Sequence, residues 1–343
     1  MNLRKKIAVY RKDPSRKPHL ITLYEVIRCL LKEGECSYYF SNLLYKKDAS
    51  NYLDYIGNKK SLRIRKEVFK LDGILNDKKL FQKFVQENNI AGPTCLAYIE
   101  NGHLDTGSTP IKIRTQEMLL SLLGTLAEDC ASSNSIFLKP TNGIGGGGAY
   151  KFTKGKMLMG ENAANLFTDL QKNNYIVQEA VVQHETMNRL NRSSLNTVRI
   201  LTYKKPSGEV VVASALSRMG CGGAHVDNAS CGGIFVPIDT ANARLESYGY
   251  SFITAGGLSY TAHPDNGLIF EGFEIPYFHQ SLELVRHAAS YFENSIVGWD
   301  VAITETGPIL IEGNYNPHLT GTQIACRGFR KHPVYKELLK EYM

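Results

Sequence analysis

Phe137-Leu138-Lys139-Pro140-Thr141-Asn142-Gly143-Ile144-Gly145-Gly146-Gly147-Gly148-Ala149-Tyr150 contains five glycines within six positions. Glycines leave backbone N–H groups uncovered and suit close approach to phosphate oxygens. A Walker loop would need Lys and then Ser or Thr after its last glycine, at the start of a helix, and these are absent here. The residues 149–153 alternate like a strand instead. We therefore predict a glycine flap between two strands, with Lys139 at the end of the first strand; a flexible surface hairpin is the alternative.

A second group of polar residues lies near the C-terminal end, on two apolar segments expected to be strands, 296–303 and 308–312. Glu312 and Asn314 are two residues apart and share one face of an extended chain. A hairpin brings Asp300 beside them. Two carboxylates and an amide oxygen are ligands that Mg²⁺ accepts together with substrate phosphates, so we expect a magnesium site here. The alternative is an ordinary hairpin with its polar residues turned outward.

The remaining pattern mixes helices and short strands and predicts an α+β fold. Residues 77–89 form one clear helix with Asp77 as its N-cap. Its buried side is expected to carry Leu80, Phe81, Phe84 and Val85. The first seventy residues are mostly helical in pattern. One apolar stripe there runs through Leu20, Leu23, Tyr24, Ile27, Leu30 and Leu31.

Composition excludes several classes of protein. With 343 residues, 43% hydrophobic and 21% charged, the chain is neither disordered, collagen-like nor a coiled coil, and it is long enough for two or three lobes. No apolar run reaches the ~20 residues of a membrane-spanning helix. The N-terminal end has no apolar stretch of signal-peptide length. Seven scattered cysteines fit a reducing compartment, and we expect a cytoplasmic protein.

Positive charge is concentrated at the N-terminal end. Residues 1–70 hold 17 basic and 7 acidic side chains, a net +10, whereas the whole chain carries +7. Such a segment suits an anionic lipid surface, a polyanionic substrate or simply a solvated face. No zinc spacing or aromatic RNA-binding motif accompanies it, so no nucleic-acid partner is expected. Peripheral contact with a membrane or a glycosyltransferase is the interaction that we expect of this basic segment.

Three features together resemble the ATP-grasp superfamily: Lys139 with the glycine flap, the segment 177–181, and Asp300 followed by Glu312 and Asn314. Within it, the chain looks like the sugar-transfer associated ATP-grasp family over roughly residues 76–323. The resemblance implies an ATP-grasp fold, in which two α+β lobes clasp ATP. We expect a helical, basic N-terminal domain at 1–75, a first lobe with the flap at 76–180, and a second lobe with the metal site at 181–343.

The resemblance also implies roles for individual residues. The cofactor would be ATP with two Mg²⁺ ions, Mn²⁺ being the substitute ion, held by Asp300, Glu312 and Asn314. Lys139 would contact the phosphates, and the flap would close over them with Asn142, Gly143, Gly145, Gly146, Gly147 and Gly148. The adenine would lie against the hinge formed by Gln178, Glu179, Ala180 and Val181. Glu185, just after the hinge, is the expected ribose contact.

Three further residues are expected to act on the substrate. Arg218 and Asn228 lie in a segment that resembles the one around the transferring phosphate in ATP-grasp peptide ligases. A guanidinium there would stabilise the charge that develops during transfer. Arg199 projects from a strand and would clamp a substrate carboxylate with two hydrogen bonds. A structural salt bridge is the alternative for each arginine.

These residues together predict an ATP-dependent carboxylate–amine ligase that forms an amide through an acylphosphate. The family resemblance associates it with cell-surface polysaccharide biosynthesis and the modification of a sugar or uronic acid. Its expected partners are small carboxylate and amine substrates, among them a nucleotide sugar or saccharide. Two alternatives stay open: an ATP-grasp kinase that phosphorylates a hydroxyl, and a non-catalytic nucleotide-binding partner of a glycosyltransferase.

Overall fold

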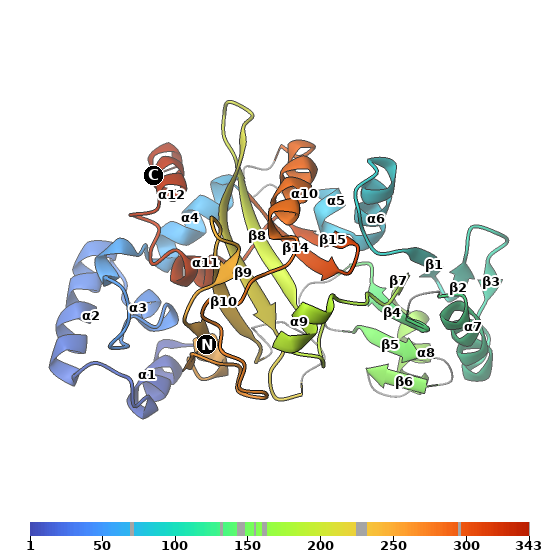
Figure 1. The fold of residues 1–343 in the computed structure, drawn as a ribbon, viewed down its shortest axis with the longest axis horizontal. Helices are drawn as coiled ribbons and strands as arrows, with labels where there is room; N and C mark the ends of the chain where they lie inside the picture. The colour runs from blue at the N-terminus through green and yellow to red at the C-terminus, as the bar shows by residue number, and fades with distance from the viewer. Residues whose placement is uncertain are drawn as a thin grey trace.

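The computed structural model has the expected mixture of helices and mainly antiparallel strands, and the α+β class is confirmed (Figure 1). The structure describes residues 1–68, 72–130, 133–142, 148–153, 156–159, 163–223, 232–293 and 296–342. Within these ranges no helix is long and apolar enough to cross a bilayer.

The smaller of two sheets has the strand order β3-β2-β1-β7-β4-β5-β6 among the described residues. Its strands are β1 (Cys95–Glu100), β2 (His103–Asp105), β3 (Ile111–Lys112), β4 (Ser135–Pro140), β5 (Tyr150–Thr153), β6 (Lys156–Met159) and β7 (Tyr175–Glu179). Two helices, α7 (Gln116–Glu128) and α8 (Ala163–Leu170), supply apolar residues to its core, where Leu119, Leu123 and Leu166 are fully buried. The predicted strand on each side of the glycine segment is present, because β4 pairs antiparallel with β5.

The larger sheet has the order β13-β12-β10-β9-β8-β14-β15, with β11 paired to β10. Its strands are β8 (Thr197–Lys204), β9 (Val210–Met219), β10 (Ile234–Asp239), β11 (Arg244–Leu245), β12 (Gly249–Tyr250), β13 (Ser259–Tyr260), β14 (Ile296–Thr304) and β15 (Gly307–Asn314). One face packs on α10 (Phe278–Ser290) and α9 (Glu185–Leu190) through a core that contains Val198, Ile200 and Trp299.

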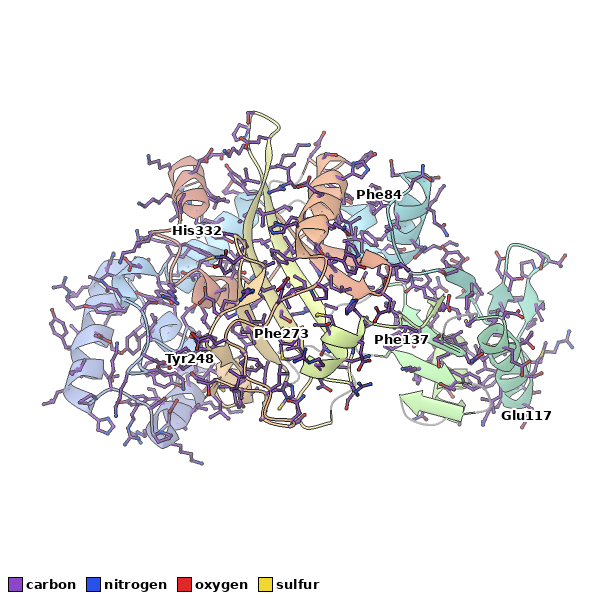
Figure 2. The ribbon with its side chains drawn as sticks, viewed as in Figure 1. Phe84, Glu117, Phe137, Tyr248, Phe273 and His332 are labelled. Carbon is purple, nitrogen blue, oxygen red and sulfur yellow. The ribbon has the colours of Figure 1, made fainter. Side chains whose placement is uncertain are left out.

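The helix predicted at 77–89 is α6 (Lys78–Glu87), preceded by α5 (Gly73–Asn76). Asp77 is its N-cap, as predicted, since its carboxylate accepts hydrogen bonds from the backbone N–H groups of Lys79 and Leu80. The buried face carries Phe81, Phe84 and Val85, but the prediction for Leu80 was wrong because its side chain is 46% exposed. Leu80 lies about 100° around the helix from Phe81, outside the narrow strip that meets the core. Phe84, which is labelled on α6 in Figure 2, contacts Phe292, so α6 packs on the core of the larger sheet.

The other face of the larger sheet is covered by the two ends of the chain. The N-terminal helices are α1 (Leu3–Lys12), α2 (His19–Glu33), α3 (Ser37–Ser41), η1 (Tyr52–Asp54) and α4 (Asn58–Val68), and the C-terminal ones are α11 (Leu319–Ala325) and α12 (Pro333–Tyr342). Tyr38 and Tyr39 of α3 share one buried cluster with Leu216 of β9 and Phe235 of β10. The N-terminal segment is therefore built into the same body as the larger sheet.

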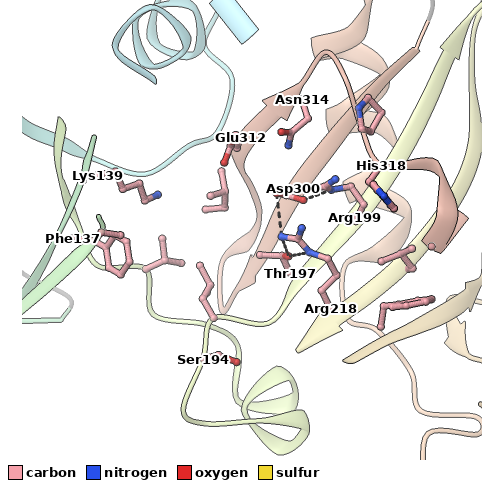
Figure 3. A pocket seen from close by; sticks show the side chains of 18 of the residues that line it. Phe137, Lys139, Ser194, Thr197, Arg199, Arg218, Asp300, Glu312, Asn314 and His318 are labelled. Atoms are coloured by element: carbon pink, nitrogen blue, oxygen red, sulfur yellow. Dashed lines mark hydrogen bonds and ion pairs between the residues drawn. The ribbon is translucent and has the colours of Figure 1, made fainter. Parts of the chain in front are cut away.

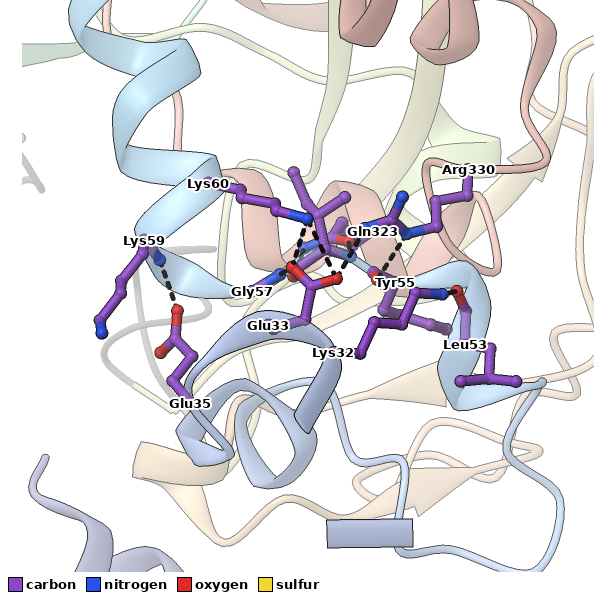
Figure 4. Close-up of polar contacts among 11 residues, drawn as sticks. Lys32, Glu33, Glu35, Leu53, Tyr55, Gly57, Lys59, Lys60, Gln323 and Arg330 are labelled. Atoms are coloured by element: carbon purple, nitrogen blue, oxygen red, sulfur yellow. Dashed lines mark hydrogen bonds and ion pairs between the residues drawn. The ribbon is translucent and has the colours of Figure 1, made fainter. Parts of the chain in front are cut away.

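Buried polar contacts reinforce this junction (Figure 4). The carboxylate of Glu33, at the end of α2, accepts from Arg330 at 2.6 Å and pairs with Lys60 at 3.2 Å. Gln323 of α11 accepts from the backbone N–H of Ile56 at 2.9 Å. Because buried polar groups are costly when unpaired, these contacts fix the position of the N-terminal helices on the C-terminal ones.

Candidate functional site

The face of the larger sheet that is turned away from α10 also carries a row of charged side chains, which line a cavity. Alternation along β8 turns Val198 and Ile200 into the core, so Thr197 and Arg199 project from the opposite face. The antiparallel register places Arg199 opposite Asp300 of β14, and Asp300 opposite Glu312 of β15. Opposite residues of paired strands project from the same face, which brings the two carboxylates predicted as metal ligands together.

Asp300 forms the centre of this row (Figure 3). Arg199 donates to it through two nitrogens, with Nη2 2.8 Å from Oδ2. Arg218 on β9 lies 3.1 Å from the same Oδ2 and also donates to Thr197 Oγ1 from Nε at 3.1 Å and from Nη2 at 3.0 Å. The clamp that we expected Arg199 to make on a substrate carboxylate is thus made on Asp300 in this structure.

The charge of Asp300 is stabilised by its neighbours. Burial alone would raise the pKa of this carboxyl group, but the positive charges of Arg199 and Arg218 outweigh that effect and hold the pKa below its ordinary value. Asp300 is therefore ionised at neutral pH although only 5% of its surface is exposed.

The hairpin beside Asp300 presents the other two predicted ligands. Glu312 and Asn314 are half-buried and line the same cavity as Asp300. Beneath them, the fully buried Trp299 packs against Phe292 and donates from its indole nitrogen to Thr202 at 2.8 Å. This packing gives the hairpin a rigid support.

Lys139 approaches from the smaller sheet. It lies near the end of β4, as predicted, with its ammonium 5.3 Å from the centre of the Phe137 ring, and both side chains line the cavity. Figure 3 shows Lys139 opposite Glu312 across the space between the two sheets. Asn142 lines the cavity as well. Gly148 has a φ of +71°, a conformation that glycine adopts readily. The expected flap residues Gly143, Gly145, Gly146 and Gly147 lie outside the described residues, as does Asn228.

The segment predicted as the hinge also faces the cavity, where Gln178, Glu179, Ala180 and Val181 are among the lining residues. The Gln178 amide is buried and donates to Gln82 Oε1 at 2.7 Å, while Gln82 donates to the carbonyl of Pro93 at 3.1 Å. Sequence reasoning missed Gln82, because nothing in a helical pattern indicates an amide partner 96 residues away.

Glu185 is not among the residues that line the cavity. It lies in the first turn of α9, is exposed, and accepts from Asn188 Nδ2 at 2.9 Å. Its carboxylate also pairs with Arg192. Asn188 and Arg192 themselves line the cavity, so the structure places them, rather than the predicted Glu185, in its wall.

The cavity is large and positively charged. Its volume is about 1100 Å³, and its described lining includes seven basic side chains against three acidic ones. The basic residues are Lys6, Lys78, Lys139, Lys151, Arg192, Arg199 and Arg218, and the acidic residues are Glu179, Asp300 and Glu312. Concentrated positive charge in a concave site favours an anionic ligand of several charges.

One end of the cavity is formed by residues that sequence reasoning missed. Lys6 of α1 is 9% exposed and donates to the hydroxyls of Ser37 and Ser41, at 2.7 and 2.6 Å. No carboxylate of the described residues forms an ion pair with it. Burial lowers the pKa of this lysine, with Glu35 opposing the change. Only the fold brings residue 6 to the same cavity as Lys139, Asp300 and Glu312, which lie far from it in the sequence.

His318 lies in the same part of the wall, against the ring of Phe252. Reduced solvation, together with the positive charges of Arg65 and Arg199, lowers the pKa of His318 from its ordinary value. The imidazole is therefore mainly neutral at neutral pH and able to accept a proton.

A family comparison covers most of the chain. The model of the family described as "sugar-transfer associated ATP-grasp" matches residues 65–332. The chain belongs to the sugar-transfer associated ATP-grasp family. The resemblance read from the sequence is confirmed, and it extends slightly beyond the predicted span of 76–323. Comparison with curated proteins gave no significant match.

Several solved structures match the chain at low sequence identity. D-alanyl-alanine synthetase A from Vibrio cholerae has a TM-score of 0.43 and 12% identity, covering 78% of this chain and 65% of that one. The ATP-grasp ligase PsnB, solved with a minimal precursor, Mg and ADP, has a TM-score of 0.39 and 13% identity, with coverages of 78% and 59%. Carboxyaminoimidazole ribonucleotide synthase from Aspergillus clavatus, complexed with ATP, has a TM-score of 0.41 and 11% identity. The match covers 72% of this chain and 46% of that one. The chain spans less than two thirds of the length of each.

The donor set of this ATP-grasp protein fits Mg²⁺ that is completed by other ligands. Asp300, Glu312 and Asn314 offer hard oxygen atoms on one face, as Mg²⁺ prefers. In the described part of the chain no group of three or more His, Cys, Asp or Glu side chains forms a closed metal cage. Such an open set suits an ion whose remaining positions are filled by phosphate oxygens and water.

Proposed function

We propose that this protein is an ATP-dependent carboxylate–amine ligase. The observation that carries the proposal is that Lys139 on one sheet and Asp300, Glu312 and Asn314 on the other line one cavity with a surplus of basic side chains. Membership of the ATP-grasp family supports ATP as the anionic ligand. The hinge residues Gln178–Val181 would then hold the adenine, as their position in the cavity wall allows.

The basic residues bind and orient the phosphates in this proposal. Lys139 holds the phosphates from the side of the smaller sheet, and Arg218 faces them from the side of the larger one. Asp300, Glu312 and Asn314 would hold two Mg²⁺ ions, which would supply positive charge next to the phosphate oxygens during transfer. Arg199 keeps Asp300 ionised and fixed in orientation through its two hydrogen bonds.

The first chemical step joins a substrate carboxylate to phosphate. A carboxylate oxygen attacks the γ-phosphorus, the bond to the β-phosphate oxygen breaks, and ADP leaves with that electron pair. Arg218 stabilises the negative charge that spreads over the transferring group. The products of this step are ADP and an acylphosphate.

The second step forms the amide. An amine nitrogen attacks the acyl carbon, the carbon–oxygen bond to phosphate breaks, and inorganic phosphate leaves. The nitrogen must lose a proton, and we propose the neutral imidazole of His318 as its acceptor. Its lowered pKa supports this role, because a base must be unprotonated at the operating pH.

The basic residue Lys6 suggests an acidic substrate at the other end of the cavity. A buried ammonium without a carboxylate partner among the described residues suits an anionic group on the acceptor, such as the second carboxylate of an amino acid or the acid of a sugar. We propose a uronic acid or another acidic saccharide of cell-surface polysaccharide biosynthesis as one substrate. Lys6→Met should raise the KM for that substrate and leave the KM for ATP unchanged. Lys5→Met, on the exposed face of α1, is the matched control.

Turnover in the presence of hydroxylamine tests the reaction class. The protein is incubated with Mg-ATP, hydroxylamine and pools of uronic acids and amino acids, and the products are analysed by mass spectrometry. ADP together with a hydroxamate is the expected result, since hydroxylamine captures an acylphosphate. ADP with a phosphorylated hydroxyl compound and no hydroxamate would instead establish a kinase. Nucleotide binding without turnover on any pool would support the non-catalytic alternative.

A further inference from the structure

The helix α2 is turned with its apolar face to the solvent. Seven large apolar side chains on this one helix are each between 47% and 81% exposed: Leu20, Ile21, Leu23, Tyr24, Ile27, Leu30 and Leu31. They account for seven of the eighteen exposed large hydrophobic residues among the described positions. An apolar stripe of this width normally faces a core, and exposed patches of this kind mark interaction surfaces.

The opposite face of α2 is buried and carries both polar and apolar side chains. Thr22, Cys29 and Glu33 follow one line along the helix and are at most 8% exposed. Glu33 is held by Arg330, Lys60 and the backbone N–H of Gly57, as Figure 4 shows in part. Rotating the helix to hide its leucines would expose Cys29 and separate this buried carboxylate from its partners. The outward orientation of the apolar face is therefore fixed by the fold.

The charge around this face is positive. Arg11 and Lys12 lie in the last turn of α1, and Arg28 and Lys32 lie on α2. All four side chains are exposed. The four acidic residues between positions 11 and 35 are all engaged within the structure. Asp13 pairs with Lys46, Glu25 with Lys17, Glu33 with Arg330, and Glu35 accepts from the backbone N–H of Lys59. Asp13 and Glu33 are buried, and Glu25 and Glu35 are half-buried.

We propose that α2 is a membrane-surface helix that docks this protein on an anionic bilayer. The helix combines leucine, isoleucine and tyrosine on one face with Arg28 and Lys32, and Arg11 and Lys12 lie at the end of α1. Apolar side chains of this kind enter the boundary between headgroups and acyl chains, and basic ones contact anionic headgroups. A second copy of the chain fits this face less well, because each copy brings the same positive residues to the contact. The proposal stands independently of the reaction assigned above.

Docking through α2 leaves the cavity accessible. The helix lies at one end of the molecule, far from the smaller sheet that carries Lys139 (Figure 1). Lys6 and Ser41, which line one end of the cavity, belong to the same N-terminal segment as α2. The protein therefore binds the bilayer by one end and keeps the space between its two sheets open to the aqueous phase.

Vesicle flotation with the full chain tests the proposal. Vesicles of phosphatidylcholine alone are compared with vesicles that contain about one third phosphatidylglycerol. We expect the protein to float with the anionic vesicles and not with the neutral ones, and ~0.5 M NaCl to reduce the bound fraction. The triple variant Leu23→Ser, Ile27→Ser, Leu31→Ser should lower binding by about 100-fold or more. Arg28→Glu should lower it by about tenfold.

The matched control replaces three exposed apolar side chains elsewhere, Leu80→Ser, Leu258→Ser and Ile269→Ser, and should float like the wild type. Circular dichroism checks that each variant is folded, which is expected because the altered side chains of α2 point to the solvent. Absence of flotation with anionic vesicles, or unchanged flotation of the α2 variant, would overturn the proposal. A concentration-dependent dimer that the α2 variant abolishes, with no vesicle binding, would assign this face to a second copy instead.

Discussion

Asp300 and Glu312 are both predicted metal ligands, yet they differ in burial and in their ion pairs. Asp300 is buried between two guanidinium groups, whereas Glu312 is half-buried and forms no ion pair with another described residue. We predict that Asp300→Asn abolishes turnover and also lowers the free energy of unfolding by about 3 kcal/mol, because Arg199 and Arg218 lose the charge that compensates their burial. Urea unfolding and ADP release measure the two effects.

Glu312→Gln is the matched comparison, since it removes one carboxylate from the same face of the sheet. Its free energy of unfolding should stay within about 0.5 kcal/mol of the wild type, while its turnover should need a higher Mg²⁺ concentration. Equal losses of stability in the two variants would contradict the central position that we assign to Asp300 in the ion cluster.

His318 gives a prediction about pH. The pKa of its imidazole is lowered below the ordinary 6.5, so the neutral form is complete at pH 7 and is lost as the pH falls through the lowered pKa. If His318 accepts the amine proton, kcat/KM for the amine should decrease on the acid side with an inflection below 6.5. His318→Gln should lower the plateau and remove this inflection from the pH–rate profile.

His332 serves as the control for this assignment. Burial lowers the pKa of this histidine as well, but it packs against Tyr335 and is not among the residues that line the cavity. His332→Gln should leave the acid limb of the profile unchanged. If His332→Gln removes the inflection instead, the pH dependence comes from a change in the folded structure and not from a base that acts on the amine.

At the scale of elements, the hairpin of β14 and β15 depends on a glycine. A Cβ at Gly313 would lie 2.8 Å from Trp299 Cζ3 and 2.6 Å from Leu75 Cδ2, too close for either packed side chain. Gly313→Ala should therefore lower the free energy of unfolding by about 1–3 kcal/mol and displace Glu312 and Asn314 on either side. Thermal unfolding and the Mg²⁺ dependence of turnover measure the two consequences.

The helix α7 offers a matched substitution at Gly124, where an added Cβ meets nothing within 4 Å. Gly124→Ala should stabilise the protein by about 0.5–1 kcal/mol, because alanine loses less conformational freedom in a helix than glycine. A destabilising Gly124→Ala would show that the packing argument for Gly313 is incomplete.

Sequence periodicity predicted which side chains share a face of a strand or helix better than it predicted which other segments they contact. The alternation around Asp300, Glu312 and Asn314 is a local property of two strands, and so the side chains that share a face were predictable. The stripe on α2 was equally visible, but periodicity does not tell which face of a helix meets the core. The prediction that Leu80 is buried was wrong for a related reason, because the width of the buried strip of a helix depends on its packing partner. The pairing of Gln178 with Gln82 and the entry of Lys6 into the cavity depend on contacts between distant segments.

At the scale of the whole molecule, the two ends of the chain support one end of the cavity together. Arg330 donates to the buried carboxylate of Glu33 at 2.6 Å and to the carbonyl of Tyr55 at 3.3 Å. Its own backbone N–H donates to the carbonyl of Asp54 at 2.9 Å. These contacts connect the segment after α11 to the N-terminal helices that carry Lys6. Loss of the Arg330 side chain should therefore loosen the N-terminal segment without touching the larger sheet.

We predict that Arg330→Ala lowers the free energy of unfolding by about 3 kcal/mol, because it leaves a buried carboxylate with one ion-pair partner fewer. Arg327→Ala, three residues away, removes an exposed pair with Glu246 and should cost less than about 0.5 kcal/mol. Limited proteolysis should cut the N-terminal segment faster in the first variant only. Since Lys6 belongs to that segment and Lys139 does not, Arg330→Ala should raise the KM for the acidic substrate while the KM for ATP stays constant. A parallel rise of both KM values would mean that the N-terminal segment supports the whole cavity rather than its far end.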